Sequence, residues 1–181
     1  MLLSLSFARR LTRRLAAASL ALALAACSPV FNWREVPVGA AGLVALLPCK
    51  PDRATRSIAL ASESVDVTMA GCNAGEATFA VAQVMADSRS QADAWLATWR
   101  AQMRDSWRGA TLDETSAAVP RADNPPPGRR FSAHTDRARI DVLWFTQVQA
   151  DGHVALYQAT LLGAPSEPDA AATFFEGLRL P

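Results

Sequence analysis

Residues 139–162 read RIDVLWFTQVQADGHVALYQATLL, and this stretch decides the predicted fold. Successive side chains of a β-strand point to opposite faces of its sheet. Residues 139–149 would therefore place Ile140, Val142, Trp144, Thr146 and Val148 on one face, and Asp141, Leu143, Phe145 and Gln147 on the other. Because both faces carry large apolar side chains, we expect a central strand that is covered on both sides. Asp151-Gly152 is a hairpin-turn dipeptide, so residues 154–162 are predicted to return as a second strand.

Shorter segments with strand character precede this hairpin. An unbroken apolar run closed by Pro48 and a polar–apolar alternation over residues 64–69 are both typical of strands. The predicted strands are 43–47, 55–60, 65–69 and 77–85, with a further edge strand at 111–119. Residues 71–75 read GCNAG, a composition that predicts a turn.

Residues 90–107 have the clearest helical pattern. Ser90 with Asp93 three residues later indicates a capping box, and Gly109 lies where a C-terminal cap would end the helix. Apolar side chains recur on one helical face, namely Ala92, Trp95, Leu96, Trp99 and Met103. We expect Trp95 and Trp99 to cover the sheet, with stacking on sugar rings as the alternative role.

A second, shorter helix is predicted near the C-terminus. Residues 166–169 read SEPD, with a proline suited to the first turn, and the helix would close near Gly177. Strands, a long helix, a hairpin and a terminal helix together indicate an α+β domain. We expect an antiparallel β-sheet with a long central helix and a short C-terminal helix packed on it, in an α/β/α sandwich-like arrangement.

Two short segments add a family resemblance to this order of elements. One is a strand that runs into a proline, residues 43–48, and the other is the tail FEGLRL at residues 175–180. In this combination the chain resembles the PsbP-like α/β/α sandwich domains. The resemblance spans most of residues 43–181 and implies a docking or assembly subunit rather than an enzyme.

The N-terminus has the layout of a bacterial export signal. Four arginines lie within residues 1–14, and a short apolar segment over residues 15–26 follows. That segment is shorter than the roughly 20 residues that a membrane-spanning helix needs. It ends in Leu24-Ala25-Ala26-Cys27, which resembles the lipobox of bacterial lipoproteins. The alternative is an ordinary secreted protein cut near residue 25, with a free thiol at Cys27.

The lipoprotein resemblance implies a location and a domain organisation. Residues 1–26 would be removed as a signal peptide, and Cys27 would receive a diacylglyceryl group and fatty acids such as palmitate. In this family a serine after the cysteine, here Ser28, is associated with the outer membrane, facing the periplasm. We therefore divide the chain into the signal peptide, a lipidated N-terminus and tether over residues 27–42, and a single domain over residues 43–181.

Lipidation of Cys27 leaves two other cysteines, Cys49 and Cys72. In an exported protein an even remainder favours a disulfide between them. Two buried thiols and a metal pair are the alternatives, but neither cysteine has a second ligand at the spacing of a zinc site. We therefore expect a disulfide and no bound metal.

Charge and motif content narrow the function classes. Without the four signal arginines the chain keeps fourteen basic and seventeen acidic residues, a formal balance of −3. This weakly acidic balance argues against a nucleic-acid partner. No nucleophile elbow, zinc-binding HExxH, P-loop or dinucleotide motif occurs in the sequence, so we expect no cofactor.

One possible binding surface lies on the predicted long helix. Arg100, Arg104 and Arg108 follow at four-residue steps, and Trp107 is the helix tryptophan that we expect to be partly exposed. These residues could bind an anionic envelope component or an acidic partner protein. The alternative is a solvated helix face without a ligand. Residues 124–128, NPPPG, predict an exposed connecting loop.

Three hypotheses for function follow. The first is a non-enzymatic, membrane-anchored envelope protein that binds another envelope component. The second is a small envelope hydrolase, which would need His134 or His153 joined to a carboxylate and a nucleophile. The third is a carrier of lipid or a small ligand, which would need an apolar cavity inside the sandwich.

Overall fold

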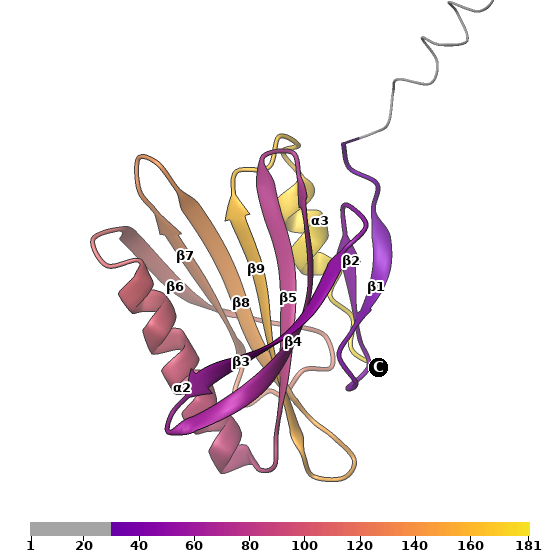
Figure 1. Cartoon of the computed structure of the whole chain (residues 1–181), viewed down its shortest axis with the longest axis vertical. Coiled ribbons are helices and arrows are strands. Elements are labelled where there is room, and N and C mark those ends of the chain that lie inside the picture. The colour runs from indigo at the N-terminus through magenta and orange to yellow at the C-terminus, as the bar shows by residue number, and fades with distance from the viewer. Residues whose placement is uncertain (1–29) are drawn as a thin grey trace, which may run out of the picture. The chain divides into compact units, whose positions relative to one another are not determined.

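The structure, a computed structural model, describes residues 30–181 (Figure 1). Seven antiparallel strands form one sheet in the order β3-β4-β5-β9-β8-β7-β6. Their bounds are β3 Asp52–Leu60, β4 Glu63–Ala74, β5 Ala77–Ala86, β6 Thr111–Ala117, β7 Gly128–His134, β8 Arg139–Val148 and β9 Val154–Gly163. The other elements are the hairpin of β1 Arg34–Val38 and β2 Leu43–Leu47, helix α2 Arg89–Ser106 and helix α3 Ala170–Glu176. The predicted α+β class, with a long and a short helix on an antiparallel sheet, is therefore confirmed.

The central hairpin forms as the alternation predicts. β8 and β9 pair from Ile140 with Leu162 down to Val148 with Val154. The turn between them closes through a 2.8 Å hydrogen bond from the N–H of Gln149 to the carbonyl of His153. Gly152 has φ +88° in this turn, a left-handed value that favours glycine. The two faces of β8 enter different core clusters, so the strand is covered on both sides.

Helix α2 covers one face of the sheet. Trp95 and Trp99 are buried against apolar side chains of β4, β5 and β9, whereas Trp107 is only partly buried. The core role expected for Trp95 and Trp99 is thus confirmed. The predicted cap is wrong by two residues, because Ser88 is the N-cap and its hydroxyl accepts from the N–H of Gln91 at 3.3 Å. Ser90 lies inside the first turn instead.

A second layer of α3 and the β1–β2 hairpin covers the opposite face. Aromatic side chains fill the space between this layer and the sheet. The ring of Phe79 on β5 lies 6.2 Å from that of Phe31, 6.1 Å from that of Trp33 and 5.4 Å from that of Phe174. These contacts pack the interior with side chains and give no support to the ligand-carrier hypothesis.

The hairpin corrects the predicted tether over residues 27–42. From Phe31 onward this segment belongs to the domain, because β1 pairs with β2 along five residues and buries Val36 and Val38. The sequence pattern missed β1 because it is short and contains Pro37, which weakens a strand prediction. Cys27 and the signal peptide lie outside the described residues. No helix in residues 30–181 is long and apolar enough to cross a membrane.

The predicted turn at residues 71–75 is also corrected. β4 continues to Ala74 and the chain reverses at Gly75 and Glu76. Gly71 lies within the strand, at a point where β5 approaches closely. A methyl group at this position would lie 2.8 Å from the carbonyl oxygen of Phe79. Pairing with β5 therefore outweighs the turn-like local composition.

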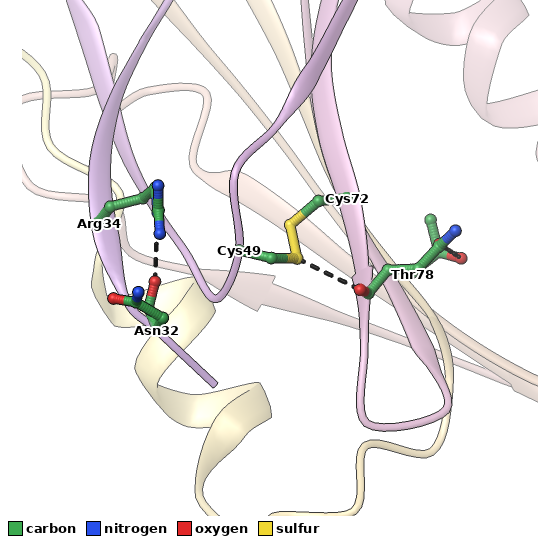
Figure 2. Close-up of a disulfide and its surroundings, with 6 residues drawn as sticks. Asn32, Arg34, Cys49, Cys72 and Thr78 are labelled. Atoms are coloured by element: carbon green, nitrogen blue, oxygen red, sulfur yellow. Dashed lines mark hydrogen bonds between the residues drawn. A yellow bond between two sulfur atoms is a disulfide. The ribbon is translucent and has the colours of Figure 1, made fainter. Parts of the chain in front are cut away.

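The expected disulfide between Cys49 and Cys72 is present (Figure 2). Cys49 follows β2 and Cys72 lies in β4, so the bond links the hairpin layer to the main sheet. Next to it, the hydroxyl of Thr78 donates to the side-chain oxygen of Asn73 at 2.7 Å. The disulfide closes a loop between residues 23 positions apart.

Removing this disulfide is expected to lower the free energy of unfolding by about 3 kcal/mol, because a loop of this length restricts the unfolded chain. Urea denaturation of the Cys49→Ala/Cys72→Ala variant against the oxidised protein measures the difference. Adding a reductant should reproduce the loss in the parent protein and leave the variant unchanged. Equal stability of variant and parent would contradict the structural role of this bond.

Candidate functional site

The arginines of the predicted binding surface are held by acidic side chains. Arg100 and Arg104 both donate to the carboxylate of Glu114 on β6. Arg108, just beyond the end of α2, is paired with Asp105 of that helix at 2.9 Å. Two of the three arginines therefore clamp α2 to the edge strand. The structure does not arrange them as a row of free cations with Trp107.

The surroundings of Glu114, the acidic residue of this clamp, shift its pKa. Burial by itself raises the pKa of Glu114, but hydrogen bonds from Arg104 and Arg100 outweigh it and hold this pKa below its ordinary value. Asp113, the preceding residue on β6, points to the other face and is exposed. The two carboxylates are thus separated by the sheet, as their adjacency in a strand predicts.

We expect the Glu114 clamp to make the domain acid-sensitive. A lowered folded-state pKa stabilises the fold above the unfolded value of about 4.3, and this stability is lost as the pH falls through the lower folded value. Glu114→Gln should cost about 1–2 kcal/mol at neutral pH and flatten the stability profile below about pH 4. Urea denaturation across that range measures this. The exposed neighbour provides the control, since Asp113→Asn should leave the profile unchanged; a parallel loss in both variants would contradict the clamp.

A second polar network fixes the proline-rich loop. Arg89 at the start of α2 donates to Asp123, which also accepts from the hydroxyl of Thr146 at 2.8 Å and the N–H of Val148 at 3.0 Å. Burial raises the pKa of Asp123, but these hydrogen bonds outweigh it and lower the pKa overall. The network leaves Pro125 to Pro127 exposed, as predicted for this loop.

The two histidines lie at opposite ends of β8. His134 is the register partner of Arg139 at one end of the strand, and within residues 30–181 its side chain makes no hydrogen bond. His153, in the β8–β9 turn, lies 3.1 Å from Asp151 and 3.7 Å from Asp87. Within residues 30–181, neither imidazole is hydrogen-bonded to a hydroxyl or thiol. The hydrolase hypothesis therefore gains no nucleophile–base pair from this geometry.

A hollow lies on the sheet face that α3 and the hairpin leave partly open. We call it the β7 groove, and its volume is about 730 Å³. It is lined by β7, the β7–β8 turn, the β4–β5 turn and the segment after β9, through Glu76, Ser132, His134, Thr135, Arg137, Arg139 and Ala164 among others. It brings together residues that are far apart in the sequence.

A buried carboxylate lies beside the β7 groove. Asp141 of β8 is 2% exposed, in a strand whose neighbouring positions are apolar. It accepts hydrogen bonds from the hydroxyl of Ser132 at 2.5 Å and from Nε of Arg139 at 3.0 Å. A buried carboxylate is costly unless it is paired, so this site depends on its arginine and serine partners.

A second basic group extends the site toward an apolar hollow. Nη2 of Arg130 lies 3.8 Å from Asp141, and its guanidinium carbon lies 4.5 Å from the centre of the Phe175 ring. Arg130 and Phe175 also line a hollow of about 390 Å³ with Leu143 and Val119. Arg130 and Ser132 are two residues apart on one strand, so the two hollows share the same sheet face.

This arrangement is suited to binding. The guanidinium groups of Arg130 and Arg139 are positioned by Asp141 and remain 39% and 60% exposed. Partly exposed guanidinium groups can donate further hydrogen bonds to a carboxylate or phosphate. The adjacent hollow at Phe175 offers apolar contact. The site therefore suits a ligand with an acidic group next to an apolar one.

The sequence prediction missed this site. The only local signal of this site is Asp141, a charged residue between apolar residues of a strand. Charged residues are seldom fully buried unless they are paired. No protein-family model matches the chain, and a search of curated proteins gives no match. The fold and this site are therefore the basis of the functional proposal.

Proposed function

We propose that this protein is a bacterial envelope lipoprotein, anchored through lipid on Cys27 and facing the periplasm from the outer membrane. It acts as a non-enzymatic binding module, and its β7 groove takes another envelope component. The anchor is supported by the lipobox-like run at residues 24–27. The disulfide agrees with an exported protein, because such bonds persist in oxidising compartments.

The observation that carries the binding role is the cluster around Asp141. The paired Asp141 carboxylate positions Arg139 at the β7 groove and Arg130 at the apolar hollow on the same sheet face. Arg130 and Arg139 would bind an acidic group of the partner, and Phe175 with Val119 would contact its apolar part. The partner class is therefore an envelope protein or an anionic envelope component with neighbouring apolar surface.

Site-specific crosslinking in cells tests this role. A photo-crosslinking amino acid at Thr115 would report on the apolar hollow next to the β7 groove, because Thr115 is exposed and opposite Arg130, which lines that hollow. Thr55 is the matched control: it is an exposed threonine on β3, the opposite edge strand of the same sheet. We expect a discrete crosslinked product from Thr115 and none from Thr55.

Arg130 provides the second part of the test. Arg130→Ala, which leaves Asp141 paired with Arg139 at 3.0 Å and Ser132 at 2.5 Å, should lower the Thr115 crosslink yield severalfold while the amount of protein stays constant. Equal crosslinking from Thr115 and Thr55, or a yield that does not change when Arg130 is truncated, would contradict binding at this face of the sheet.

A further inference from the structure

The folded domain begins close to the proposed anchor. Phe31 is buried and follows Cys27 by four residues. An extended chain spans at most about 3.5 Å per residue, so Phe31 lies within about 14 Å of Cys27. The Phe31 ring packs at the β4–β5 turn, where a methyl group on Gly75 would lie 2.5 Å from it. A lipid on Cys27 would thus keep this end of the sheet near the bilayer.

Strand register defines which residues share that end of the sheet. Thr78 follows the β4–β5 turn and pairs with Leu162 of β9, which pairs with Ile140 of β8. Ile140 pairs with Ala133, and Ala133 pairs with Leu112 of β6. One cross-strand row therefore runs from the turn beside Phe31 to the edge strand. We call it the Leu112–Leu162 row.

Exposed apolar side chains concentrate at this end. Leu112 is 44% and Leu162 is 43% exposed, although Ala133 and Ile140 between them are buried. Trp107, at the end of α2, is partly exposed and packs against the core cluster that contains Ala133 and Ile140. At the opposite end of the sheet, the exposed large apolar residue is Val148, at 49%.

The charges at this end do not favour an anionic surface. Arg108 is paired with Asp105, and Arg137 adjoins Asp136 in the β7–β8 turn. An attraction based on charge would need an excess of cations. Apolar side chains together with a tryptophan are instead suited to the interfacial region of a bilayer.

We propose that the Leu112–Leu162 row, with Trp107, is a membrane-docking surface that contacts the bilayer in which the anchor is inserted. This docking rests on the anchoring proposed above. The anchor would raise the local concentration of lipid so far that a small apolar surface suffices for contact. Contact would fix the orientation of the domain on the membrane and so the direction in which the β7 groove opens.

The test holds the chain on vesicles whether or not Cys27 is lipidated in cells. The chain from residue 27 onward contains every described element, so Cys27→Ser with a histidine tag before it can be bound to vesicles that contain nickel-chelating lipid. An environment-sensitive fluorophore is attached at Leu112→Cys, or at Val148→Cys as the matched control. Cys49 and Cys72 are bonded to each other and do not react.

The two probes should respond differently. On vesicles of phosphatidylethanolamine and phosphatidylglycerol, emission from position 112 should shift to shorter wavelength and be quenched by brominated acyl chains. Emission from position 148 should match that in buffer, and raised salt should change neither result. A probe at position 112 that stays in water, or equal responses at both positions, would overturn the docking. The state of Cys27 is measured separately by mass, so anchoring and docking can fail independently.

Discussion

Cys27→Ser is expected to transfer the protein from the membrane fraction to the soluble fraction of the cell envelope. Serine has no thiol, so no thioether-linked diacylglyceryl group can form. Each methylene that enters the bilayer contributes about 0.8 kcal/mol, so two or more acyl chains hold a protein firmly whereas none leaves only the weak contact of the domain surface. Fractionation of cells followed by immunodetection measures the change.

Ser28→Ala is the matched control for this experiment. It changes the next residue and leaves the cysteine in place, so we expect the protein to stay in the membrane fraction. Retention of Cys27→Ser in the membrane at the level of the parent would contradict the lipid anchor. It would also show that another part of the chain or a bound partner provides the attachment.

Phe79→Ala is expected to destabilise the domain by about 3–5 kcal/mol, the range for removing a large aromatic side chain from a core. Phe79 is fully buried and contacts rings from the hairpin layer and from α3. Its loss would leave a cavity where the sheet meets both covering elements. Urea denaturation followed by tryptophan fluorescence measures the change.

Val148→Ala provides the comparison for this prediction. This residue also lies in the main sheet but is 49% exposed, so its truncation should cost less than about 0.5 kcal/mol. Similar losses in the two variants would contradict the packing of the hairpin layer on the sheet. It would mean that Phe79 is not at the centre of a shared core.

The elements that sequence predicted well have long, regular patterns. β8 alternates over ten residues, which fits the two-residue period of a strand and not that of a helix. α2 repeats its apolar face over eighteen residues, which fits the 3.6-residue period of a helix and not that of a strand. β1 has five residues, includes Pro37, and is held by pairing with β2 that no local pattern reveals. The predicted cap of α2 was wrong for a related reason, because two serines, Ser88 and Ser90, could serve and only the geometry selects Ser88.

The candidate site was less predictable than the fold. Arg100 and Arg104 lie on α2 as predicted and Arg108 lies just beyond its end, but the pairing of the first two with Glu114 depends on β6 lying beside the helix. Ser132 and Asp141 meet because β7 and β8 pair in one particular register. Arg130 reaches Phe175 only after α3 has folded over the sheet. Such contacts between distant segments are set by tertiary structure and leave little trace in local sequence.

The mass of the N-terminal peptide of the protein purified from its native membrane is the most direct test of the proposed envelope lipoprotein. We predict a peptide that begins at Cys27 and carries the added mass of a diacylglyceryl group and fatty acid. A chain that begins at another residue, or a Cys27 with an unmodified thiol, would contradict the lipid anchor.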